Sequence, residues 1–250
     1  MHDEVTALLR PLARVATKLE PKKVRDAASL PITGSHFGGA PFAEAGEEWP
    51  VCPTCQTSLA FICQINTASG FHRPPEGVDL FTFFYCWECS PWGLSDEVKG
   101  TWVVRNYLLP DERKATLLPT PDEQPQPTGA CEVLAERVLS FPDWDEIDSQ
   151  SREAAEAATK ANSDEPWEAY NSAVEALGGF TDYATVVGGY PRWVQGEATP
   201  DCESCKGEMR LLAQIDTEDE ADIIWGDVGC VYIFYCPEHP KETKLELQCF

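Results

Sequence analysis

Eight residues of this sequence have the types and the spacing of metal ligands, and they fall into two sets of four. The first set is Cys52, Cys55, Cys86 and Cys89, and the second set is Cys202, Cys205, Cys236 and His239. A Cys-x-x-Cys turn presents two thiolates close together, so two such turns that meet in space complete the tetrahedral shell that zinc prefers. The exchange of the last cysteine for histidine favours a metal over a disulfide, because histidine is a zinc ligand.

The spacing within each set predicts a structural role for the metal. In both sets thirty residues separate the second ligand from the third, which is more than the roughly 15 to 20 residues of a compact zinc ribbon. The interval has room for two strands, so each ion would hold the base of a hairpin. Four protein ligands leave no position for a catalytic water. We therefore expect two structural zinc ions, and the alternatives are thiols without metal or a catalytic zinc ion.

The two ligand sets belong to a segment that occurs twice. Residues 38–89 align with residues 188–239 without a gap, 150 positions later. The aligned positions include a Gly-Gly-x-Pro motif, in which glycine permits a positive φ and proline fixes the exit of the chain. They also include Gln64 and Gln214, which end apolar strands and are expected to hydrogen-bond a neighbouring loop. The sequence predicts a β-rich α+β fold, with an internal duplication of two zinc-tied β modules and peripheral helices.

Hydrophobic periodicity predicts the elements that must position the ligands. Strands are expected at residues 59–65, 79–85 and 101–105 in the first module, and at 209–215, 230–235 and 245–249 in the second. A helix is expected at residues 5–19 or, because proline favours the first turn of a helix, from near Pro11 to Leu19. Residues 131–180 are expected to be helical, with helices at 152–161 and from Pro166 to Leu177. The predicted organisation is therefore an N-terminal helical segment (1–30), a first β/zinc module (31–109), a Pro-rich linker with an acidic helical segment (110–180) and a second β/zinc module (181–250). The two modules are expected to pack as one unit.

Charge and cysteine content restrict the class of protein. The chain has 250 residues, of which 42 are acidic and 19 basic, for a formal net charge of −23. This charge repels nucleic-acid phosphates and favours a basic partner, with general solubility as the alternative explanation. No signal peptide or membrane-spanning run is recognisable, so we expect a cytoplasmic protein in which the cysteines are metal ligands or buried thiols. The cysteines outside the ligand sets, expected to be buried, are Cys63, Cys131, Cys230 and Cys249.

One loop differs between the two copies and is a candidate for partner binding. In the second copy it carries the acidic residues Asp216, Glu218, Asp219, Glu220 and Asp222. The loop lacks the glycine and the distal bidentate glutamate of a calcium site, so we expect a solvated acidic loop or a contact for a basic partner. His36 and His72 are the remaining candidates for a general base, but no nucleophile motif or assignable carboxylate pair accompanies them. No catalytic residue is predicted.

Several motifs resemble known families. His-Phe-Gly-Gly-Ala-Pro at residues 36–41, Trp-Pro at 49–50 and Gly-Gly-Tyr-Pro at 188–191 look like the YwqG-like family of bacterial proteins, whose function is unassigned. The cysteine pairs, with Phe-His-Arg at 71–73 and Val-Val-Arg-Asn at 103–106, are similar to the programmed cell death protein 2 family. That resemblance implies duplicated β-rich modules and the chaperoning of a basic ribosomal protein. This chain lacks the additional zinc finger of some of those relatives, so the ribosomal role is an analogy.

These observations lead to a hypothesis about function. We expect a non-catalytic, zinc-binding interaction protein of the chaperone, immunity or adaptor type, whose acidic surface binds a basic protein partner. Neither nucleic acid nor a membrane is an expected partner. The alternatives are a metal-dependent hydrolase with an open second zinc site at His239, and a scaffold of unassigned function.

Overall fold

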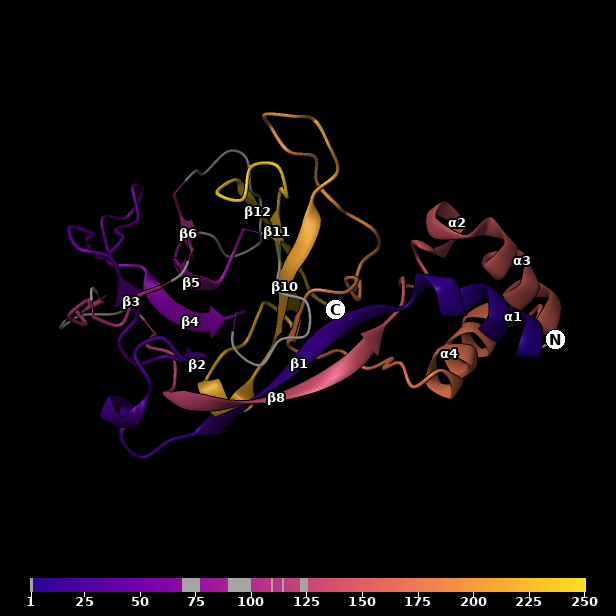
Figure 1. Cartoon of the computed structure of the whole chain (residues 1–250), viewed down its shortest axis with the longest axis horizontal. Coiled ribbons are helices and arrows are strands. Elements are labelled where there is room, and N and C mark those ends of the chain that lie inside the picture. The colour runs from indigo at the N-terminus through magenta and orange to yellow at the C-terminus, as the bar shows by residue number, and fades with distance from the viewer. Residues whose placement is uncertain (1, 69–76, 90–99, 109, 114, 122–125) are drawn as a thin grey trace.

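A ten-stranded sheet forms the body of the protein, and a group of helices lies at one end of it (Figure 1). The computed structural model describes residues 2–68, 77–89, 100–108, 110–113, 115–121 and 126–250. Its helices are α1 (His2–Leu9), α2 (Ile147–Gln150), α3 (Arg152–Ala161) and α4 (Pro166–Ala176), with 3-10 turns at Arg10–Leu12, Ala27–Ser29 and Asp219–Ala221. The predicted β-rich fold is confirmed.

The large sheet has the order β12-β11-β10-β9-β1-β8-β2-β4-β5-β6, and its neighbouring strands are antiparallel. The strands are β1 (Arg14–Lys23), β2 (His36–Phe37), β4 (Ala60–Asn66), β5 (Leu80–Tyr85), β6 (Trp102–Tyr107), β8 (Cys131–Ser140), β9 (Val186–Val187), β10 (Arg210–Asp216), β11 (Cys230–Tyr235) and β12 (Thr243–Gln248). A second, two-stranded sheet pairs β3 (Phe42–Ala43) with β7 (Thr116–Leu117).

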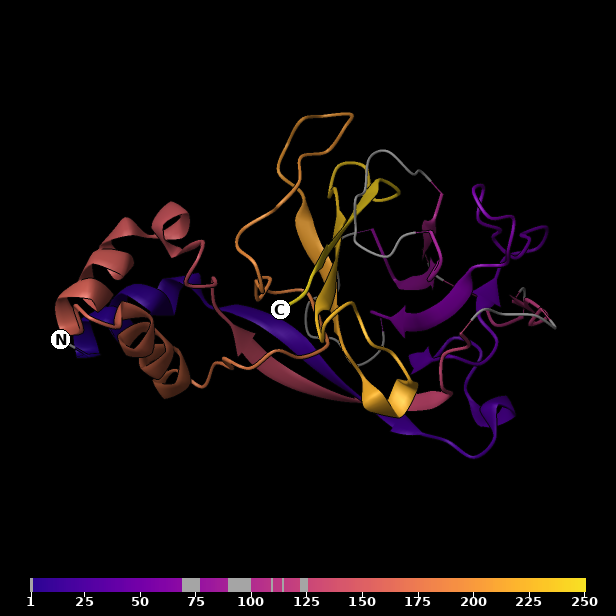
Figure 2. The ribbon, with the colours of Figure 1, turned by 180° about the vertical axis from the view of Figure 1, so that it is seen from behind.

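The central strands β1 and β8 connect the two halves of the sheet. The first half is defined as β1, β2, β4, β5 and β6, and the second half as β8 to β12. β1 is the first strand of the first half, yet it lies between β9 and β8, which both belong to the second half. β8 is the first strand of the second half, yet it lies between β1 and β2, which both belong to the first half. The two strands pair along ten residues, from Arg14 opposite Ser140 to Lys23 opposite Cys131. Each half therefore places its first strand inside the other half (Figure 2).

Both halves of the sheet contribute to one hydrophobic core. The sheet curves until its two ends approach each other, and the Asn106 side chain at the end of β6 donates a hydrogen bond to the carbonyl oxygen of Pro240 between β11 and β12. Trp225 of the second half is fully buried among aromatic residues of the first half, with its ring 5.2 Å from that of Tyr85 and 4.9 Å from that of Trp87. Burial of large aromatic side chains is a major favourable term in folding.

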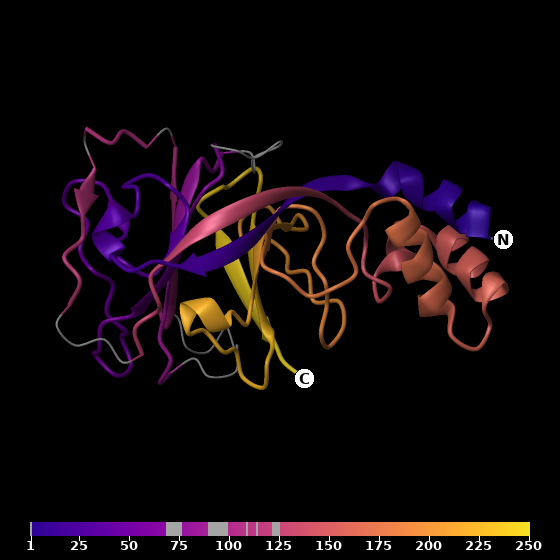
Figure 3. The same ribbon diagram turned by 90° about the horizontal axis from the view of Figure 1, so that it is seen from below.

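Helices α1 to α4 form a separate cluster, here called the helical cap, around their own apolar core (Figure 3). The core includes Leu9 of α1, Ala158 of α3 and Tyr170 of α4. The cap joins the sheet through β1 and β8, which run out of the body towards it. None of the helices that the structure describes is long and apolar enough to cross a membrane.

Most predicted elements are present, and two predictions are wrong. The strands expected in both modules correspond to β4, β5, β6, β10, β11 and β12, and the helices expected at 152–161 and from Pro166 correspond to α3 and α4. The helix expected at 5–19 ends at Leu9, because residues 14–23 form β1. The helical prediction for 131–180 fails at its start, because residues 131–140 form β8. In both places pairing between distant strands overrides local helical preference.

Candidate metal centres

The first ligand set lies where the β4–β5 hairpin opens. The chain before β4 makes a tight turn, closed by hydrogen bonds from Cys52 N to Thr57 O and from Gln56 N to Cys52 O, each 2.9 Å. Gln56 has a φ of 62° in this turn, a left-handed conformation that reverses the chain within a few residues. Cys86 directly follows the last residue of β5. Since β4 begins and β5 ends at the same edge of the hairpin, the sequence brings all four thiols to one place.

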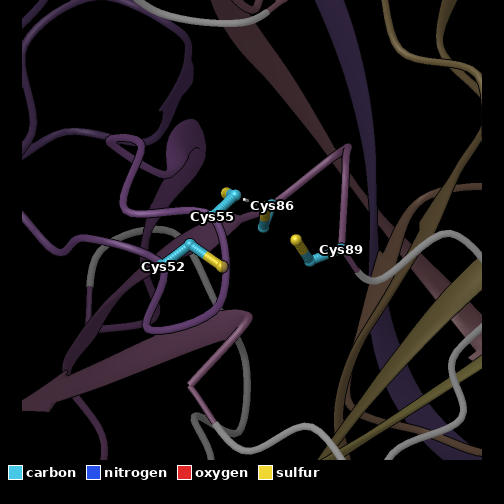
Figure 4. Close-up of side chains that lie close together, drawn as sticks. All are labelled: Cys52, Cys55, Cys86 and Cys89. Atoms are coloured by element: carbon cyan, nitrogen blue, oxygen red, sulfur yellow. Dashed lines mark hydrogen bonds between the residues drawn. The ribbon is translucent and has the colours of Figure 1, made fainter.

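The geometry of this cluster fits a metal ion. The four Sγ atoms of Cys52, Cys55, Cys86 and Cys89 all lie within 4.8 Å of one another, and Figure 4 shows the side chains gathered at the end of the hairpin. The Cys55 and Cys86 Sγ atoms are 3.6 Å apart, too far for a disulfide bond of about 2.05 Å. A tetrahedral zinc ion with bonds of about 2.3 Å would separate its thiolates by about 3.8 Å. The four donors therefore surround a space of the right size for one ion.

The second ligand set repeats this arrangement in the β10–β11 hairpin. Hydrogen bonds from Cys202 N to Gly207 O, 2.9 Å, and from Lys206 N to Cys202 O, 3.0 Å, close the turn before β10. The His239 Nδ1 atom lies 3.6 Å from Cys236 Sγ and 3.7 Å from Cys202 Sγ. A mixed thiolate and imidazole shell with zinc bonds of about 2.3 and 2.0 Å would place these atoms about 3.5 Å apart. This cluster also fits a metal ion.

Hydrogen bonds favour the thiolate form of one cysteine in each cluster. Contacts from the hydroxyl and the backbone of Thr57 lower the pKa of Cys55 to about 6. Burial opposes ionisation of Cys236, but hydrogen bonds from the side chain and backbone of His239 outweigh it and lower the pKa of that thiol to about 7. Burial raises the pKa of Cys86 to about 12, and hydrogen bonds with Cys52 and Cys55 act in the same direction. A bound cation would favour the thiolate form of this residue.

Two residues near the clusters were not found from the sequence. Thr57 Oγ1 lies 2.9 Å from Cys55 Sγ, and Glu242 Oε2 lies 3.0 Å from Cys202 Sγ. Glu242 also bonds the Ser204 hydroxyl and accepts from the Ser204 backbone N–H at 3.3 Å. Such outer contacts orient metal ligands. The only sequence signal for Glu242 is its position three residues after His239, too weak to be diagnostic.

The structure separates the other predicted residues from the metal clusters. His36 is buried, its Nδ1 lies 2.8 Å from the Gly38 carbonyl oxygen, and burial lowers its pKa to about 4. It therefore packs as a neutral core residue. His72 lies outside the described residues. Three of the leftover cysteines, Cys63, Cys131 and Cys230, are buried as predicted, and Cys249 is half-buried. All eleven cysteines lie within the described residues, and each is free.

The acidic loop of the second half is only partly exposed. Glu218 is half-buried and accepts a hydrogen bond from the Thr185 hydroxyl, while Asp216 accepts from the Thr217 backbone N–H at 2.9 Å. Asp222 forms an ion pair with Lys23 of β1, 3.0 Å. The other two acidic residues of the loop, Asp219 and Glu220, are exposed in the 3-10 turn that follows Glu218. Asp216 and Glu218 are therefore less exposed than the expected solvated loop implies, and the alternative of a contact for a basic partner stays a prediction.

Gln64 and Gln214 each hydrogen-bond a neighbouring loop, as predicted, and in both halves this loop includes the residue that follows the Gly-Gly-x-Pro motif. Gln64 Oε1 accepts from the Phe42 backbone N–H at 2.6 Å, and Gln214 Oε1 accepts from the Arg192 backbone N–H at 2.8 Å. The amide group of Gln64 donates to the Gly34 carbonyl oxygen at 2.8 Å, and that of Gln214 donates to the corresponding carbonyl of residue 184 at 3.1 Å. Both glutamines are fully buried, so these bonds satisfy groups that water does not reach.

Two four-donor clusters that fit metal ions, in a curved, β-rich sheet, characterise this protein. Residues 35–245 match the model of a domain family of unknown function, DUF1963. This match spans most of the chain, and the protein belongs to that family. No curated protein matches the chain. The matched region contains both clusters and α2 to α4, whereas α1 and β1 precede it.

Proposed function

We propose that the protein is a non-catalytic binding protein, built from a duplicated module whose two copies are each tied by a structural zinc ion, and that its partner is a basic protein. The observation that carries the proposal is the closed donor set at the end of each hairpin. Four protein donors complete a tetrahedral zinc shell, and a complete shell supports folding rather than chemistry on a bound water.

Matching interactions 150 residues apart support the duplication. The same register shift interrupts the β4–β5 ladder between Phe61 and Cys63 and the β10–β11 ladder between Leu211 and Ala213. Isolated bridges join residues 51 and 58 in one half and residues 201 and 208 in the other. The glutamine contacts and both ligand turns also recur at this offset. Independent origins would not produce the same backbone irregularities at one constant offset.

Several features support zinc as the metal. Thiolate and imidazole donors suit zinc, while calcium and magnesium prefer oxygen ligands. The donor separations agree with zinc bond lengths in both clusters. The clusters are attached to hairpins whose strands enter the core, so each ion would anchor a long-range pairing of the sheet.

The distribution of charge supports a basic partner. Residues 2–13 and 141–182, which contain the helical cap, hold 13 acidic and three basic residues. Exposed carboxylates on both long helices of the cap include Glu153, Glu156, Glu168 and Glu175. Such a field accelerates the approach of a positively charged protein and weakens as salt screens it.

Native mass spectrometry of the intact chain tests the metal part. We expect the mass of two zinc ions, falling to one in Cys86→Ser and in Cys236→Ser, and staying at two in the matched control Cys249→Ser. Cobalt substitution adds a test of closure: a tetrahedral visible spectrum that added azide leaves unchanged is expected. A ligand exchange with azide would show an open position and favour the hydrolase alternative.

Binding of a fluorescent oligo-lysine peptide tests the partner part. At about 0.15 M salt, where exposed charges further apart than about 8 Å are screened, we expect binding that exceeds that of an acetylated peptide of equal length. Equal binding of the two peptides, or none, would refute a basic partner while leaving the zinc result intact.

A further inference from the structure

A pocket of about 520 Å³ opens beside the crossing strands β1 and β8, on the side of the second half. Its walls come from residues 18–20 of β1, residues 134–136 of β8, the segment 183–185 before β9, and the end of β10. Two of its lining residues, Glu20 and Leu134, lie directly opposite each other in the β1–β8 ladder. The pocket therefore lies over the middle of the large sheet, away from both metal clusters.

The lining carries more negative than positive charge. Glu20 is paired with Lys22, and the other three carboxylates, those of Glu136, Asp216 and Glu218, face one lysine, Lys18. Glu218 is held in place by the Thr185 hydroxyl, and Asp216 by the Thr217 backbone N–H and the Cys230 thiol, 3.0 Å away. Burial and the neighbouring carboxylates raise the pKa of Glu218 to about 7. Fixed, partly buried carboxylates with too few cations form a site that a positive group would stabilise.

The first half shows that the fold does not need these acids. Ser35 occupies the position 150 residues before Thr185, and its hydroxyl accepts from the Asn66 backbone N–H at 3.0 Å. Thr185 makes the matching contact with the Asp216 backbone N–H at 3.1 Å. The hairpin is thus built in the same way with Asn66 in place of Asp216, and with Ala68 in place of Glu218. The carboxylates are an addition to a framework that stands without them.

We propose that this pocket receives a lysine or arginine side chain from a basic segment of the partner protein. This proposal rests on the proposed function and places the partner's binding site in the pocket. The positive group would lie between the carboxylates of Asp216 and Glu218. The exposed side chain of Leu134, 52% accessible, forms an apolar edge beside the pocket on which the aliphatic part of the same segment can pack.

The internal repeat supplies the variant that tests this site. Asp216→Asn combined with Glu218→Ala gives the second half the residues that the first half carries at these positions. The matched control is Asp227→Asn combined with Glu44→Ala, which removes the same charge from exposed positions outside both the pocket and the helical cap. Affinity for the oligo-lysine peptide at about 0.15 M salt is measured by fluorescence anisotropy, and circular dichroism checks that each variant is folded.

We expect the pocket variant to bind at least roughly tenfold more weakly than the unaltered chain, and the control variant to bind within roughly twofold of it. Glu218→Gln, which keeps a hydrogen-bonding oxygen for Thr185, should give an intermediate loss even if the double variant folds poorly. Equal losses in the two double variants would overturn the pocket but retain a basic partner. No peptide binding by the unaltered chain would refute the proposed partner itself. Spermine binding as tight as peptide binding would assign the pocket to free polyamines and overturn the protein segment.

Discussion

Replacing Glu146 with glutamine is expected to stabilise the protein at neutral and alkaline pH. This carboxylate lies where the helical cap meets the second half, is 6% exposed, and accepts a hydrogen bond from Trp193 Nε1 at 3.0 Å. Burial raises its pKa from 4.5 to about 7, and the charges of Asp143 and Glu197 act in the same direction. The hydrogen bond from Trp193 and the charge of Arg14 oppose the rise without cancelling it.

The sign and size of the effect follow from this pKa. A carboxyl group whose pKa is higher in the folded state holds its proton more tightly there, so its contribution is complete below pH 4.5 and is lost as the pH rises through about 7. At about 1.4 kcal/mol per pH unit, the difference corresponds to roughly 3 kcal/mol. Glutamine stays neutral at every pH, and its oxygen can still accept the hydrogen bond from Trp193.

Urea unfolding at pH 5.5 and at pH 8 measures the difference. The Glu146→Gln variant should exceed the unaltered chain in free energy of unfolding by roughly 2 to 3 kcal/mol at pH 8, and by less at pH 5.5. Glu156→Gln on the exposed face of α3 is the matched control, and its pH profile should follow that of the unaltered chain. Parallel profiles for Glu146→Gln and the unaltered chain would show that ionising this carboxylate costs the folded state nothing, and would refute the reasoning.

Three further predictions concern the core, the loops and the metal. Trp225→Ala removes a fully buried ring that packs on aromatic residues of the first half. In urea titrations this variant should lower the free energy of unfolding by about 3 to 5 kcal/mol, and a loss below about 1 kcal/mol would contradict a shared core. Gln214→Ala leaves the Arg192 backbone N–H without its acceptor and should cost about 1 to 3 kcal/mol by the same assay. Chelation should lower the melting temperature and added zinc should restore it, whereas an unchanged melting curve after complete metal removal would contradict a structural ion.

The sequence predicts the hairpins well because their signals are local. In both halves an apolar run that includes a glutamine follows the first ligand pair, and a second ligand pair comes thirty residues after the first. Together these signals predict a strand, a turn and a second strand. Spacing alone also predicts that the four donors of each set meet, and the structure brings them together. The gapless alignment anticipates even the shared contacts of Gln64 and Gln214.

The strands β1 and β8 could not be predicted in the same way. Residues 5–19 contain leucines at helical spacing, and Pro21 argues against a central strand. The structure accommodates Pro21 because β9 pairs only with Thr17 and Lys18, so no ladder is interrupted further along that side of β1. Residues 131–140 contain Leu134 and Ala135 among glutamates, a composition typical of helices. Their strand conformation depends on a partner more than one hundred residues away, which no local window contains.

The pocket was also beyond reach from the sequence for a physical reason. Its walls combine β1, β8, the segment before β9 and the end of β10, so it exists only once distant parts of the chain are assembled. The loop that differs between the two copies contains Asp216 and Glu218. From sequence alone, however, an acidic loop is predicted to be solvent-exposed, because the residues that pack against it are unknown. Comparing the two copies remains the best guide to it, since the copies differ at these two positions while the surrounding contacts agree.

The reciprocal placement of β1 and β8 makes the two halves inseparable without unfolding. A protease cut in the connection between β7 and β8 would leave each fragment with a strand inserted in the other, paired on both sides. The nicked protein should therefore travel as one particle in native gel filtration and divide only in denaturant. If the two halves were expressed separately, each would lack the strand that the other half inserts into its sheet. Mixing the two halves should then restore the complete sheet. A chain containing only one such half would meet the same requirement by exchanging its first strand with a second copy of itself.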